Sequence, residues 1–151
     1  MPCEEGLEAI EPFLREIMDA VEPRQRKRLA DKLMRMARRE NAQRIARNVE
    51  PEGGPMAPRK RRTGRKRGKM FKRIGKTSSL RIRTTPDMGE LTFANRMVED
   101  TAATHHFGLE GFVGKTRAGR VVRTKYQARQ LLGFGREREE LIDEVLQHLA
   151  S

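Results

Sequence analysis

The chain has 151 residues, of which 36% are hydrophobic and 36% are charged, and its net charge is +12. A chain of this length forms one domain, and so high a charged fraction leaves a modest core that gains from burial against neighbours. The single cysteine, Cys3, excludes an internal disulfide, and no apolar run approaches the roughly 20 residues of a membrane span. We therefore expect a soluble cytosolic product without a membrane partner.

The charge is divided into blocks along the chain. Residues 1–22 carry seven acidic side chains and one basic, and residues 23–49 carry ten basic and two acidic. Residues 57–85 carry thirteen basic side chains and no acid, and residues 136–151 carry five acids and two basic residues. Such blocks can meet opposite blocks on another copy or on another protein.

The N-terminal third predicts two helices. Apolar residues recur at helical spacing over residues 7–21, and Pro23 follows. A second apolar stripe, with arginines on the other faces, covers residues 24–49. The two segments predict an αα-hairpin, which ends at the Pro- and Gly-rich stretch 51–55.

Residues 51–69 predict a basic, flexible loop without an apolar pattern. Its candidate partner-binding residues are Arg59, Lys60, Arg61, Arg62, Arg65, Lys66, Arg67 and Lys69. Three functional interpretations of the loop remain: contact with nucleic acid, docking onto an acidic protein surface, and a nuclear-localisation-like run. The alternative is a solvated loop that orders only on assembly. Base stacking has little support, because Phe71 is the only aromatic residue nearby.

The rest of the chain alternates short elements. Residues 70–74 predict one helical turn, residues 80–84 and 90–94 a strand hairpin, and residues 98–106 a helix that Gly108 stops. Residues 111–119 predict a loop and residues 119–126 a third strand. Residues 136–150 predict a helix whose buried face is Leu141, Ile142, Val145, Leu146 and Leu149.

These elements predict one α+β domain over residues 1–151. It combines an N-terminal helical hairpin, a small antiparallel sheet of about three to four strands, and a C-terminal amphipathic helix.

Chemical motifs are weak throughout. Residues 64–70 have three residues between the glycines instead of four, and Met70 stands where a phosphate loop needs Ser or Thr. His105 and His106 are adjacent, so on a helix they point about 100° apart and cannot easily share a metal ion. Cys3 has no evident activating partner. We expect neither an enzyme, nor a metal site, nor a cofactor.

A tight apolar corner, residues 126–134, follows the third predicted strand. Leu131, Leu132 and Phe134 suit packing within the subunit or against a neighbour, and Gly133 punctuates the entry to the last helix. No group in the corner has obvious chemistry. The corner therefore indicates a structural or assembly protein.

In order along the chain, four features resemble the phage virion morphogenesis family, the tail completion proteins of contractile-tailed phages. A basic helix ends at residues 50–53, and a basic loop ends at residues 68–71. A His-x-Phe-Gly type motif covers residues 105–108, and an acidic helix closes the chain. The corner resembles the Ala-Arg-Pro-Leu-Leu-Gly-Phe signature, with Gln130 in place of proline, so it loses a fixed φ and gains a backbone N–H.

The resemblance implies a non-enzymatic subunit at the head-proximal end of the tail. By analogy with related tail-terminating proteins, it would form a six-fold ring, complete the tail tube and help join the tail to the head. Implied partners are further copies of the chain, the tail tube or tail terminator, the head–tail connector, and DNA in the channel without sequence specificity. The protein would be made in the host cytoplasm and lie in the tail–neck region of the virion.

The resemblance and the corner together add interface candidates to those of the basic loop. They are His106, Phe107, Gly108, Ala128, Arg129, Leu131, Leu132, Gly133 and Phe134. The alternative function is a basic nucleic-acid-binding protein. Mass measurement without nucleic acid separates the two, because a discrete ring favours assembly and a monomer that shifts only with DNA favours the alternative.

Overall fold

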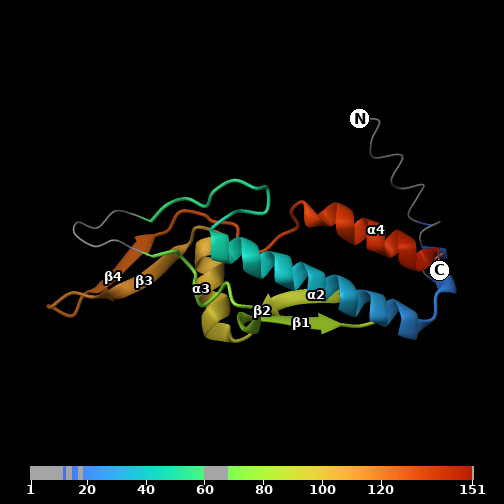
Figure 1. Ribbon diagram of the computed structural model, residues 1–151. Helices are drawn as coiled ribbons and strands as arrows, with labels where there is room; N and C mark the ends of the chain where they lie inside the picture. Colours follow the sequence, from blue (N-terminus) through green and yellow to red (C-terminus); the bar gives the residue numbers. More distant parts are fainter. Residues whose placement is uncertain (1–11, 13–14, 17–18, 60–67, 151) are drawn as a thin grey trace.

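Helix α2 (Pro23–Arg47) is the long central helix, and the other elements lie along it or at its end (Figure 1). The computed structural model describes residues 12, 15–16, 19–59 and 68–150. A proline suits the first turn of α2, where an N–H has no partner within the helix. The helix ends at Asn48, whose backbone is left-handed and whose side-chain Nδ2 donates to the Met70 carbonyl at 3.0 Å.

The second predicted helix is therefore confirmed to within two residues at its C-terminus. The first predicted helix, residues 7–21, falls largely outside the described residues, and so does the predicted pairing of the two.

A strand hairpin lies along one side of α2. It follows the 3-10 turn η1 (Thr77–Ser79) and consists of β1 (Leu80–Thr84) and β2 (Gly89–Phe93), which are antiparallel. Leu80 is buried, and the Thr84 hydroxyl is hydrogen-bonded to the carboxylate of Asp31 on α2. The predicted hairpin is confirmed.

Helix α3 (Arg96–His106) crosses the end of α2. Asn95 caps it, because its side-chain oxygen accepts the Val98 N–H at 2.9 Å. The helix ends at His106, and Gly108 follows at φ +65°, in agreement with the prediction that Gly108 stops the helix. The turn predicted over residues 70–74 is present as one hydrogen bond, from the Gly75 N–H to the Phe71 carbonyl at 2.8 Å.

One apolar cluster joins the end of α2 to α3 and to the segments around them. Its buried members are Ile45, Met56, Met70, Ile74, Ala102 and Leu131. The cluster lies at the C-terminal end of α2 and includes Leu131 of the corner. The N-terminal half of α2 packs instead against the β1–β2 hairpin and α4.

A second, separate two-stranded ribbon projects from the body beyond α3 (Figure 1). It consists of β3 (Glu110–Lys115) and β4 (Val121–Lys125), antiparallel, with a register shift between Phe112 and Gly114. The loop predicted over residues 111–119 is therefore wrong for β3, and the four strands form two sheets where one was expected. Gly111 within β3 has a packing role: a Cβ at this position would lie 2.8 Å from Tyr126 Cε2.

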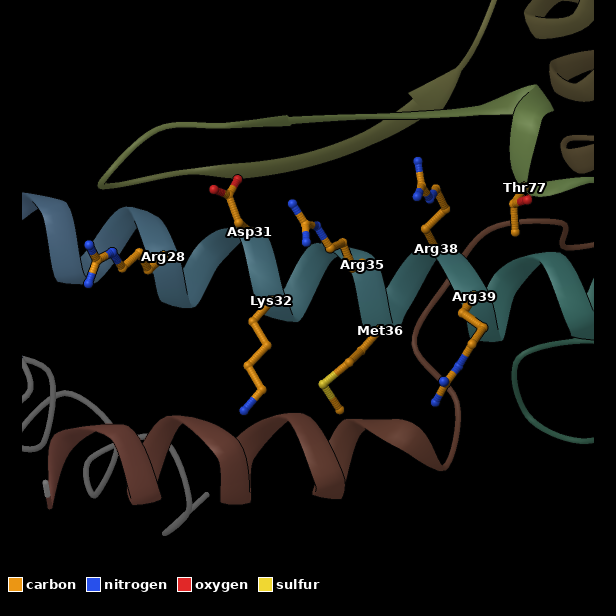
Figure 2. A pocket seen from close by; sticks show the side chains of 8 residues that line it. All are labelled: Arg28, Asp31, Lys32, Arg35, Met36, Arg38, Arg39 and Thr77. Carbon is orange, nitrogen blue, oxygen red and sulfur yellow. The ribbon is translucent and has the colours of Figure 1, made fainter.

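Helix α4 (Glu137–Leu149) packs along the opposite side of α2 from the β1–β2 hairpin (Figure 2). Lys32 of α2 forms an ion pair with Glu144 of α4. The predicted buried face is wrong for two residues, because Ile142 and Leu146 are 49% and 56% exposed. Helix α2 packs on one side of α4, and the margin of the apolar stripe that carries Ile142 and Leu146 lies outside that contact.

Among the described residues, no helix combines the length and apolar character that crossing a membrane requires.

Candidate assembly surfaces

The first half of the corner is held by Arg129. The Arg129 backbone N–H donates to the His105 carbonyl at 2.8 Å. Its buried guanidinium donates to the carbonyls of Ala57 at 2.6 Å and Pro58 at 2.9 Å. Burial lowers the pKa of Arg129, and the charge of Arg59 adds to that effect. Arg129 thus ties the corner to the chain just before the basic segment.

The second half of the corner is held by a polar network on α2. The Asn41 side-chain oxygen accepts the Gly133 N–H at 3.1 Å and the Arg44 Nη2 at 2.9 Å. The same Arg44 nitrogen donates to the Gly133 carbonyl and lies 3.3 Å from Glu137 Oε1. Burial lowers the pKa of Arg44, and the nearby Glu137 carboxylate opposes this. These groups lie about ninety positions apart in sequence, so the network joins α2 to the corner and to the start of α4.

Glycine at position 133 is required by the close approach of Pro51. A Cβ added to Gly133 would lie 2.7 Å from the Pro51 Cγ, and contacts this short are essentially never observed. Gln130, which stands where the family signature has proline, also has a structural consequence. Its backbone N–H donates to Glu50 Oε1 at 3.3 Å, a bond that proline could not make.

The histidine pair supports the corner. His105 makes edge-on ring contacts with Phe71 and Tyr126, at centroid distances of 5.0 Å and 4.5 Å. Burial lowers the pKa of His105, and the charges of Arg129 and Arg59 lower it further. His106 Nδ1 accepts the Leu131 N–H at 3.2 Å, which assigns the proton of the neutral ring to Nε2. The described residues contain no group of three or more His, Cys, Asp or Glu side chains that could hold a metal ion.

The structure divides the candidate interface residues into three groups. Within the subunit, Arg129, Leu131 and Gly108 are buried, and His106, Leu132 and Gly133 are half-buried. On the surface lie Arg59, Lys69, Phe107, Ala128 and Phe134. Lys60, Arg61, Arg62, Arg65, Lys66 and Arg67 lie outside the described residues.

The β3–β4 ribbon is a surface that the sequence did not single out. Phe112 is 62% exposed and Val121 is 55% exposed, and their neighbours Val113 and Val122 are also exposed. Because successive strand residues point to opposite faces, apolar side chains lie on both faces of the ribbon, among the basic side chains of Lys115, Arg123 and Lys125. A cavity of about 640 Å³ lies between the ribbon, α3 and the start of the basic segment, and we call it the ribbon cavity. In the sequence, the adjacent Val121 and Val122 were the feature that could have indicated this apolar surface.

The exposed side of α2 forms a second, cationic surface (Figure 2). A shallow cavity of about 580 Å³ is lined by Arg28, Asp31, Lys32, Arg35, Met36, Arg38, Arg39 and Thr77. Arg35 and Arg38 point toward the β1–β2 hairpin, whereas Lys32 and Arg39 point toward α4. Within the described part of the chain, Arg28, Arg35 and Arg38 have no acidic partner, so this surface favours an anionic neighbour.

These features define a small α+β protein. A polar network ties the corner to α2, and the described residues of the ribbon, of α2 and of α4 expose apolar and charged side chains. The phage virion morphogenesis family model matches residues 6–150. Tail completion protein S of Escherichia phage P2 is 31% identical over 135 residues, which cover 86% of this chain and 87% of that protein. No solved structure matches.

The chain therefore belongs to the phage virion morphogenesis family, a family of structural proteins, as the order of sequence features indicated.

Proposed function

We propose that this protein is a ring subunit at the head-proximal end of a phage tail, where it completes the tail tube and enables the tail to join the head. The β3–β4 ribbon carries the proposal. An isolated two-stranded hairpin is marginally stable in water, and the exposed aromatic and aliphatic side chains of this one gain burial only against a partner. A neighbouring subunit or tail protein would cover Phe112 and Val121.

The relative's name, tail completion protein S, supports the stage of assembly that we propose. The charge distribution supports several partners. The arginine-rich side of α2 is positively charged. The outer side of α4 is negatively charged and carries Glu139, Glu140 and Asp143. The tail tube or terminator, the head–tail connector and further copies of the chain are the partners that we propose in the tail–neck region of the virion.

Deletion of the gene tests the proposal. Infected cells should then accumulate filled heads and separate tails, and the gene supplied in trans should restore joined particles. Purified protein without nucleic acid should have the mass of a discrete closed ring, six-fold by our proposal. Normal yields of infectious particles after deletion would contradict the function.

The alternative, nucleic-acid binding, is favoured by the basic segment and by Arg28, Arg35 and Arg38, which have no acidic partner within the described residues. In that case the purified chain should be a monomer that binds duplex DNA with a steep dependence on salt. If both observations were made and no ring formed, the alternative would replace the proposal.

A further inference from the structure

The outer side of α4 carries a short stripe that is both apolar and acidic. Ile142 and Leu146 are exposed and four residues apart, so they lie on one side of the helix. Glu139 and Asp143 are exposed beside them and have no ionic partner within the described residues. This stripe faces away from the contact with α2, in which Glu144 pairs with Lys32.

The ribbon cavity has the opposite electrostatic character. Val113 and Val122 supply apolar lining, and Arg59, Arg123 and Lys125 supply positive charge. Of the described residues that line the cavity, none is acidic. Its volume is about 640 Å³. An acidic helix with two aliphatic side chains fits both its lining and its charge.

The structure points to a contact between copies in which the α4 stripe of one subunit docks into the ribbon cavity of the next; this rests on the ring that we propose. Pairing of two α4 stripes would oppose acidic side chains, and pairing of two ribbons would oppose Arg123 and Lys125. Each surface is therefore complementary to the other and not to itself.

The positions of the two surfaces give this contact a direction. The ribbon and α4 lie toward opposite ends of the molecule (Figure 1). A contact between two different surfaces is head-to-tail, and it closes into a ring when the rotation between neighbours closes. The same pair of surfaces would then serve every contact of the ring.

Disulfide cross-linking of full-length protein tests the geometry directly. In a Cys3→Ser background, we would combine Leu146→Cys with Val122→Cys and oxidise purified protein and isolated particles. The double variant should give a ladder of covalent multimers that ends at the ring size. Each single variant should give no dimer. A dimer from Leu146→Cys alone would show that α4 pairs with itself and would overturn the contact.

Charge exchange provides a second test that does not depend on new cysteines. One double variant reverses the charge of the α4 stripe, Glu139→Arg with Asp143→Arg, and the other reverses that of the ribbon cavity, Arg123→Glu with Lys125→Glu. Each double variant should weaken self-association at least about tenfold. The four changes together should restore much of the self-association. Glu52→Arg with Asp100→Arg makes the same change in net charge as Glu139→Arg with Asp143→Arg, but at exposed sites elsewhere, and should leave association unchanged.

The outcomes separate this contact from the proposed function. Rings that persist in all charge variants, with no cross-linked ladder, would overturn the contact and leave the ring in place. A ladder together with normal infectious yield after gene deletion would keep the contact and overturn the function. Loss of duplex DNA binding in Arg123→Glu with Lys125→Glu, with ring formation intact, would assign the cavity to nucleic acid and overturn the contact.

Discussion

The β3–β4 ribbon and the corner follow one another in the chain, and both are rich in apolar residues, yet they differ in what surrounds them. In the corner, Leu131 is fully buried, and the polar backbone of Gly133 is bonded to Asn41 and Arg44. In the ribbon, the backbone is paired within the hairpin, and Phe112 and Val121 remain exposed.

The difference distinguishes apolar residues that specify the fold from those available for assembly. Burial of a large apolar side chain contributes roughly 1.5–3 kcal/mol, but only when solvent is removed from it. Leu131 gains this free energy within the subunit, whereas Phe112 would gain it mainly against a neighbour. Substitutions in the two regions should therefore affect different measurements.

The largest effect on folding is expected at the centre of the corner. Leu131→Ala should lower the free energy of unfolding by about 2–5 kcal/mol, because it opens a cavity at a fully buried site. Phe134→Ala is the matched control in the same segment: Phe134 is 64% exposed, so its loss should change stability by less than about 0.5 kcal/mol. Chemical denaturation of both variants makes the comparison, and equal losses would show that the corner does not depend on burial.

A smaller effect is expected from the polar network beneath the corner. Asn41→Ala removes the acceptor of the Gly133 N–H and should cost about 1–3 kcal/mol, of which the better helix propensity of alanine offsets a few tenths. Gln43→Ala, two residues away and exposed, is the control. Hydrogen exchange at the Gly133 amide should accelerate in Asn41→Ala alone. Unchanged protection of that amide would place its stabilising contact elsewhere.

The sequence predicted the corner better than the groups that hold it. Leu131 and Leu132 indicate packing by composition, and the glycines around Phe134 indicate a turn. Asn41, Arg44 and Glu137, in contrast, have the sequence signature of solvated helix residues. Their role depends on a contact between segments about ninety positions apart, which no local pattern encodes.

Two errors in predicting the fold have related physical causes. The periodicity of α4 identified an apolar stripe, but periodicity does not tell how much of a stripe its neighbours cover, so Ile142 and Leu146 were predicted buried. Residues 111–119 were predicted as a loop, because the space that Gly111 needs beside Tyr126 is set by the folded ribbon and has no signal in the local sequence. In both cases tertiary contacts decided the outcome.

A pH-dependent effect of intermediate size is expected at the edge of the corner. The pKa of His105 is lowered in the folded protein, so the unfolded chain binds the proton first as the pH falls below about 6.5. The contribution of His105 to stability is therefore complete above that pH and decreases below it. His105→Phe and His105→Gln should both remove this part of the pH dependence in denaturation profiles. Profiles parallel to the wild type would assign the effect to other groups.

The smallest effect on folding is expected in the ribbon. Phe112→Thr with Val121→Thr keeps residues that favour strands but removes exposed apolar surface. The free energy of unfolding should stay within about 0.5 kcal/mol of the wild type, because little of that surface is buried within the subunit. The yield of joined particles in complementation should nevertheless fall strongly. Lys115→Thr, in the same strand and also exposed, is the control and should preserve both measurements. A large loss of stability in the double variant would mean that the ribbon belongs to the folded core, and the distinction between the two regions would fail.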